Sequence, residues 1–275
     1  MTLTIRKNIL SLLFITTLVG TAVSVLSLLA WAQGLFAPDY IVPSFTSRWW
    51  WSLKPATSSD LPWCIAALGF SSMFPLIGEI VLSRNYGRSP SPEIFFFRVF
   101  LLTLPFQTYR LLIPLASSGV ITTSWALTVT KIAWFGRFLG LTALINISLF
   151  SGDMPFRRSG YLLGMGTLIS MAIAVMLPLD ITQPLGNLMI RTVADTALAL
   201  ACITLEVLAV AALLGSGIIQ KSLPHMLLAL YLFLVVVGSD FIYFASIPTL
   251  IPGVILILAG TLGFARKIRL IYQWR

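Results

Sequence analysis

Long, almost uninterrupted runs of apolar residues alternate with short polar breaks along the chain. A helix needs about 20 mostly apolar residues to cross the hydrocarbon core of a bilayer. Eight runs reach this length, and they predict membrane-spanning helices at roughly 8–32, 61–83, 94–116, 124–149, 159–180, 187–216, 223–244 and 247–265. Because the runs are continuous rather than alternating, membrane-spanning strands are disfavoured.

The breaks between the runs are short and rich in turn-forming residues, as in the stretch 85–92 with its two Ser-Pro pairs. No break is long enough to fold on its own, so we expect one transmembrane domain over 1–275, an all-α polytopic helical bundle. The longest break, 33–60, carries the run Trp49-Trp50-Trp51. Indole rings favour the headgroup layer. We therefore interpret 33–60 as a short extracytoplasmic loop, either an interfacial anchor or an aromatic lid over an outer pocket.

Composition agrees with the hydrophobic pattern. The 275 residues are 58% hydrophobic and only 10% charged, with a mean hydropathy of +0.96. A soluble domain carries about 25% charged residues, so soluble enzymes, nucleic-acid-binding domains and disordered chains are excluded, and the lipid bilayer is the expected partner. With two cysteines, one histidine and no recognised catalytic motif, we expect no metal site, no cofactor and no Ser-His-Asp triad.

The basic residues predict the orientation. With the N-terminus inside, two basic residues, Arg48 and Lys54, fall in outer segments. Eleven fall in inner segments: Arg6, Lys7, Arg84, Arg88, Arg157, Arg158, Lys221, Arg266, Lys267, Arg269 and Arg275. Basic residues concentrate on the cytoplasmic side of membrane proteins. The sequence therefore predicts cytoplasmic termini and a place in the cytoplasmic (inner) membrane, and the net charge of +9 needs no anionic partner.

The first run has a second interpretation. Arg6 and Lys7, the apolar run and the Ala30-Trp31-Ala32 sequence resemble a cleaved secretory signal. The run is about 22 residues long, against roughly 7–15 in such signals, which favours a retained anchor. Cleavage would leave seven spans and an outer N-terminus.

Ionisable side chains inside the runs are the candidate functional residues, since each costs about 2.5–3.5 kcal/mol to insert. The four acids are Glu79, Asp195, Glu206 and Asp240. The five bases are Arg98, Arg110, Lys131, Arg137 and Arg191. These nearly equal numbers suggest internal pairing. Glu79 and Arg98 lie at similar depth on either side of a short loop, so we expect a structural ion pair between them.

The sixth predicted span carries a polar stripe. Arg191, Asp195, Cys202 and Glu206 share one helical face, because eleven residues at 100° each return almost to the starting direction. Such a row suits a proton or cation path. It equally suits pairing with bases on neighbouring helices.

Depth also groups four charged residues in the outer half of the bundle: Arg110, Lys131, Asp195 and Asp240. Glu206 and Arg137 lie near the middle of their spans, and we add both to the candidate ligand- or ion-binding residues. Bases beside acids in one pocket suggest an anionic or zwitterionic ligand. Two glycine pairs, Gly136-x-x-x-Gly140 and Gly160-x-x-x-Gly164, predict close helix packing.

Three functions remain open from the sequence. The first is a non-catalytic receptor, sensor or accessory subunit that binds a small ligand, a lipid or a membrane partner, and signals through another membrane or cytoplasmic protein. The second is a transporter of small solutes or ions, supported by the stripe of acids. The third and weakest is a lipid-modifying enzyme, because no nucleophile-and-base set is apparent.

Overall fold

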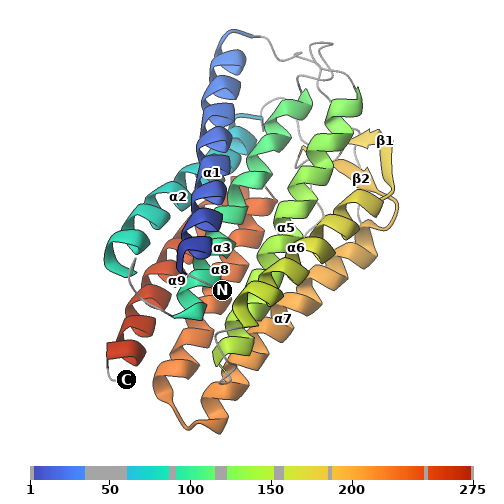
Figure 1. Cartoon of the computed structure of the whole chain (residues 1–275). Helices are drawn as coiled ribbons and strands as arrows, with labels where there is room; N and C mark the ends of the chain where they lie inside the picture. Colours follow the sequence, from blue (N-terminus) through green and yellow to red (C-terminus); the bar gives the residue numbers. More distant parts are fainter. Residues whose placement is uncertain are drawn as a thin grey trace.

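The computed structural model describes residues 3–34, 61–86, 91–114, 123–151, 158–184, 188–244 and 247–273. The α-helices are α1 Leu3–Ala32, α2 Leu61–Tyr86, α3 Pro92–Thr103, α5 Thr123–Ser151, α6 Ser159–Met176, α7 Asp195–Ile219, α8 Leu223–Tyr243 and α9 Ile247–Gln273. Figure 1 shows them as one elongated bundle. Among the described residues, seven helices are long and apolar enough to cross a membrane. The predicted all-α bundle is therefore confirmed in outline, while the Trp49–Trp51 run lies outside the described residues.

The third predicted span is not one continuous α-helix. It begins with Pro92 in the first turn, and the Ser91 hydroxyl accepts a hydrogen bond from the Ile94 amide at 3.4 Å. It then tightens at Pro105 into a 3₁₀ helix, η1, over Leu104–Leu112, because proline lacks the amide that an α-helical ladder requires. With rises of about 1.5 and 2.0 Å per residue, α3 and η1 together extend about 36 Å, enough to cross a bilayer.

The end of the fifth predicted span and the start of the sixth were wrong. Helix α6 stops at Met176, and the chain then forms a two-stranded antiparallel hairpin from β1, Leu179–Pro184, and β2, Ile190–Thr192. Pro178 explains the stop, because a residue before proline is driven out of the α region, and Leu177 is extended. Helix α7 consequently starts at Asp195 rather than near 187.

Helix α5 is the centre of the bundle, and it contacts α3, η1, α6 and α7, while α8 and α9 form a closely packed pair. Aromatic side chains fill the core. Phe97 on α3 stacks on Phe264 on α9 with ring centres 4.2 Å apart, and Arg6 lies over the Phe95 ring at 5.1 Å. These contacts place the start of α1 and the C-terminal half of α9 at the same end of the bundle, opposite the β1–β2 hairpin (Figure 1).

The two glycine pairs have different outcomes. Gly140 lies against α3, where an added Cβ would sit 2.8 Å from the Thr103 hydroxyl, and Gly136 lies against the Phe106 ring. This pair packs as predicted. Gly164 has no atom within 4 Å of an added Cβ, so the second prediction was wrong for this position. Helix α6 instead approaches α5 through Gly166, which faces Thr142.

Candidate functional site

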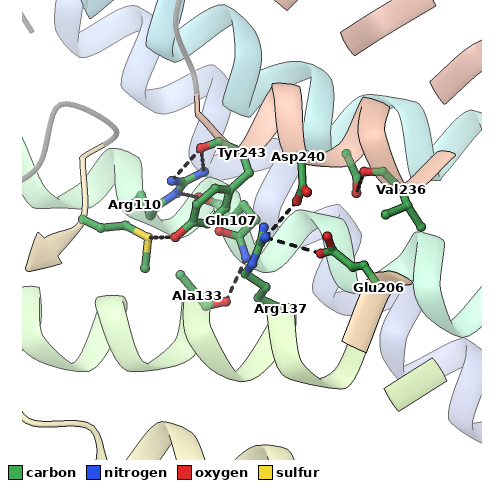
Figure 2. A network of polar contacts seen from close by, with 10 residues as sticks. Gln107, Arg110, Ala133, Arg137, Glu206, Val236, Asp240 and Tyr243 are labelled. Atoms are coloured by element: carbon green, nitrogen blue, oxygen red, sulfur yellow. Dashed lines mark hydrogen bonds and ion pairs between the residues drawn. The ribbon is translucent and has the colours of Figure 1, made fainter. Parts of the chain in front are cut away.

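Arg137 joins three helices near the middle of the bundle. It lies on α5, and its Nη2 donates to Asp240 Oδ1 on α8 at 2.8 Å and to Glu206 Oε1 on α7 at 3.5 Å. Figure 2 shows contacts from this guanidinium to both carboxylates. The Glu206 side chain is 8% exposed and that of Arg137 15%, so neither charge is well solvated by water. Each therefore depends on its partner, because an unpaired charge in such a place is costly.

Arg110 forms the second part of the site and is fully buried on η1. Its Nη1 and Nη2 donate to the Tyr243 carbonyl at 3.1 and 3.2 Å, and its Nε donates to the Gln107 carbonyl at 3.1 Å. Tyr243 is the last residue of α8. The last carbonyls of a helix lack partners within it and carry a partial negative charge. Arg110 therefore caps α8.

The Tyr243 side chain connects the two arginines. The Cζ atoms of Arg137 and Arg110 lie 4.0 and 4.8 Å from the centre of its ring, which is the geometry of cation–π contacts. The Tyr243 hydroxyl donates to the sulfur of Met189 at 3.1 Å (Figure 2). Met189 comes directly before β2, so the hairpin region is tied to the site.

A small cavity of about 40 Å³ adjoins Arg137. Helices from both halves of the chain line it. Its polar lining comprises Ser71, Thr103, Gln107, Arg110, Arg137, Glu206, Ser239 and Tyr243. A buried water needs about 10–15 Å³ by this measure. The cavity therefore has room for roughly three water molecules, or for a ligand of only a few non-hydrogen atoms.

Gln107 gives this cavity an unsatisfied acceptor. The residue is 7% exposed, and its Nε2 donates to the Ala133 carbonyl at 2.8 Å. Because Nε2 must be the donor in that bond, the amide orientation is fixed. Within the part of the chain that the structure describes, Gln107 Oε1 has no hydrogen-bond partner.

Four of the six candidate binding residues gather here, and two do not. Arg137, Glu206, Asp240 and Arg110 lie in or beside the network. The Lys131 amine donates to the Val175 carbonyl near the end of α6 at 2.8 Å. The Asp195 carboxylate accepts from the Thr192 hydroxyl at 2.6 Å and from its amide at 3.3 Å. The outer group of four expected from depth is thus replaced by a deeper one centred on Arg137.

The polar stripe of the sixth span is also corrected. Arg191 lies in β2, paired with Asp180 of β1, and so does not share a helix with the other stripe residues. On α7 the buried face contains Cys202 and Glu206, followed by small and apolar residues toward the C-terminal end of the helix. Asp195 is the first residue of this helix, where a negative charge suits the helix dipole.

Two site residues were not predicted as members. Tyr243 follows Asp240 by three positions, and residues three apart share a helical face, so a signal was available. Gln107 likewise precedes Arg110 by three positions. The predicted contact between Glu79 and Arg98 is present, with Arg98 Nε donating to both carboxylate oxygens at 2.9 and 3.1 Å. Among the described residues, no group of three His, Cys, Asp or Glu side chains is arranged to hold a metal ion.

Comparisons with other proteins leave the family open. No protein-family model matches the chain, and no solved structure matches it. A protein of Treponema pallidum (strain Nichols), described as an uncharacterized protein, is 32% identical over 109 residues. The match covers 40% of this chain and spans only 30% of the Treponema protein's length.

Proposed function

We propose that this chain is a non-catalytic membrane protein of the receptor, sensor or accessory-subunit type, with a ligand site at Arg137. One observation carries the proposal: a single guanidinium holds carboxylates from two other helices at the edge of a cavity in the bundle. A ligand that competes for Arg137, Glu206 or Asp240 changes the contacts among α5, α7 and α8. A ligand shifts a conformational equilibrium by its difference in affinity for the two states, so occupancy of this site can alter helix packing.

Ligand binding would be transmitted to a partner protein through the helices that the ligand repositions. Helices α6 and α7 carry exposed apolar side chains such as Leu168 at 65% and Val207 at 60%. These surfaces suit either lipid or the helices of a partner subunit in the cytoplasmic membrane. A separate membrane or cytoplasmic protein would then provide the output.

A transporter of small solutes or ions is the second candidate. The observation that favours it is Glu206, a carboxylate about halfway along α7 that faces the cavity rather than lipid. Acids at this depth commonly mark ion and proton pathways. A receptor binds at such a site without net movement of the ligand, whereas a transporter carries the ligand across.

Ligand binding tests the site. The full-length protein in lipid nanodiscs would be heated with ammonium, methylammonium, acetate or glycine at constant ionic strength. The proposal predicts that at least one compound raises the unfolding midpoint saturably, since a ligand that binds the folded state stabilises it. D240N should abolish this rise. S148A is the matched control, because Ser148 bonds the Ala209 carbonyl between α5 and α7 but does not line the cavity.

Flux separates the two candidate functions. The same compounds would be tested for uptake into proteoliposomes. Binding without flux supports the receptor or accessory type. Flux that E206Q and D240N abolish would instead identify the protein as a transporter. The absence of any saturable shift in the unfolding midpoint would overturn the proposed ligand site.

A further inference from the structure

We infer that the cavity beside Arg137 binds a small monovalent oxyanion that carries an O–H group, a class of which bicarbonate is the simplest probe. This inference rests on the proposed function and names the chemical class of the ligand. It narrows the anionic or zwitterionic ligand that the sequence suggests to one charge and one size.

The charge of the cavity lining favours an anion. Two guanidiniums, Arg110 and Arg137, and one carboxylate, Glu206, line the cavity. Asp240 does not line it, and its contact with Arg137 Nη2 at 2.8 Å helps to position the guanidinium. The lining that the structure describes therefore carries one more positive than negative formal charge, which a ligand with a single negative charge balances.

Arg137 also has hydrogen-bond donors to offer an anion. Within the described chain, its hydrogen bonds to oxygen leave from Nη2 alone, to Asp240 and to Glu206 (Figure 2). Its Nε and Nη1 carry further N–H groups, since a guanidinium has five in all. Hydrogen bonds from a guanidinium to an oxyanion are among the stronger ones in proteins. Arg137 can therefore bind an oxyanion in the cavity while keeping its contact with Asp240.

The two carboxylates hold Arg137 unequally. Asp240 Oδ1 lies 2.8 Å from Nη2, whereas Glu206 Oε1 lies 3.5 Å from it. The contact with Glu206 is therefore the weaker one, and Glu206 is the carboxylate that lines the cavity. An oxyanion that enters the cavity competes with Glu206 for Arg137, and so loosens the contact between α5 and α7 while the contact with α8 remains.

Gln107 indicates that the anion carries a proton donor as well. Its Nε2 donates to the Ala133 carbonyl, and among the described residues its buried Oε1 has no hydrogen-bond partner. The lining hydroxyls of Ser71, Thr103 and Ser239 donate to backbone carbonyls. Each hydroxyl has one proton to donate, so these three do not supply the donor. An O–H group on the ligand satisfies Gln107 while the charged oxygens of the ligand bind the guanidinium.

The size of the cavity restricts the ligand further. A volume of about 40 Å³ has room for roughly three water molecules. Bicarbonate, acetate and nitrate are flat anions of this size, whereas gluconate is far larger. Bicarbonate alone among the three carries an O–H group. Acetate and nitrate are therefore matched probes that keep the charge and the shape but bring no donor to Gln107.

The experiment compares these ligands on the full-length protein in lipid nanodiscs. Unfolding midpoints would be measured against the sodium salts of bicarbonate, acetate and nitrate, and against ammonium gluconate and glycine. Sodium gluconate keeps the ionic strength constant, and a mildly alkaline buffer keeps bicarbonate the main carbonate species. We expect saturable rises with the three small anions and none with ammonium or glycine. The apparent affinity for bicarbonate should exceed that for acetate and nitrate by about tenfold, the contribution of one hydrogen bond.

Two variants test the assignment in opposite directions. Q107M should lower the affinity for bicarbonate to that for acetate, because bicarbonate alone donates to Gln107 Oε1. A general loss of packing would instead weaken all three anions alike, so the ratio of affinities is the measured quantity. E206Q should strengthen the binding of all three anions by about tenfold, since it removes a negative charge that competes for Arg137. S148A, the matched control, should change none of these affinities.

Each alternative result has a defined meaning. A saturable rise with ammonium or glycine alone that D240N abolishes would overturn the anion assignment and leave the proposed function standing. Equal affinities for the three anions in the wild type, or weaker anion binding in E206Q, would overturn the assignment too. No saturable rise with any probe would overturn the inference and the proposed site together. If Q107M or E206Q does not fold, the comparison of the five probes on the wild type still decides between an anion and a cation, and between an anion with an O–H group and one without.

Discussion

At the scale of single residues, Arg137 joins α5 to both α7 and α8. It contacts carboxylates on α7 and α8 and lies over the Tyr243 ring. Removing its charge leaves Glu206 and Asp240 facing each other without a counter-ion. Since both are largely shielded from water, the remaining negative charges should destabilise the fold.

We therefore predict that R137M lowers the free energy of unfolding by about 3–5 kcal/mol, the range for breaking a buried ion pair. K131M is the matched control on the same helix, because the Lys131 amine makes a single exposed hydrogen bond to a carbonyl. It should change stability by less than about 1 kcal/mol. Denaturant unfolding in detergent micelles measures both. Similar losses in the two variants would contradict the role given to Arg137.

The sequence predicts which residues are expensive to bury, but it predicts only part of their pairing. The pair of Glu79 and Arg98 could be predicted because a short loop makes their helices neighbours. The partners of Arg137 come from helices far along the chain, and residue spacing does not encode which distant helices touch. Depth alone therefore grouped Lys131 and Asp195 with Asp240, although both bond to nearby backbone or side-chain groups.

At the scale of helices and strands, the α8–α9 pair depends on glycine. A Cβ added at Gly238 would lie 2.6 Å from the Ile257 amide and 3.0 Å from the Gly253 carbonyl. These are backbone atoms, which cannot rotate away as a side chain can. Asp240 lies two residues from Gly238, so the spacing of α8 and α9 also helps position the site.

We predict that G238A lowers the free energy of unfolding by about 1–3 kcal/mol, the usual cost of overpacking. G215A should instead raise it by about 0.5–1 kcal/mol, because alanine is the better helix former and an added Cβ there meets no atom within 4 Å. Unfolding curves of the two variants measure both changes in the free energy of unfolding, which should have opposite signs. If both variants lose stability, close α8–α9 contact is not the cause of the loss in G238A.

The hydrophobic runs predicted the positions of most helices. The predictions failed at prolines and at the β1–β2 hairpin. Pro105 converts the helix to a 3₁₀ form, and Pro178 ends α6 before its apolar run ends. Strand β2, Ile190–Thr192, is short and is flanked by the apolar residues Leu188, Met189 and Val193. Hydropathy alone therefore could not separate it from the start of a helix.

At the scale of the whole molecule, the basic residues predict the side of the membrane on which each turn lies. The turn between α7 and α8 contains Lys221 and is predicted to be cytoplasmic. Val193, between β2 and α7, is 75% exposed and is predicted to be extracytoplasmic. These two positions lie at opposite ends of α7, so the prediction places them on opposite sides of the membrane.

Cysteine labelling in intact cells checks this orientation. In a background with Cys64 and Cys202 replaced by alanine, V193C should react with a membrane-impermeant maleimide from outside. K221C should react only after the membrane is permeabilised. The reverse pattern would contradict the predicted topology while leaving the helix packing intact.

The central claim is that Arg137 and Asp240 interact directly across α5 and α8, and a double-mutant cycle tests it. Unfolding free energies would be measured for the wild type, R137M, D240N and the double variant. Groups in one ion-pair network show coupling of about 0.5–3 kcal/mol. We predict a coupling above about 1 kcal/mol, with the double variant more stable than the sum of the single losses implies. A coupling indistinguishable from zero would contradict the account.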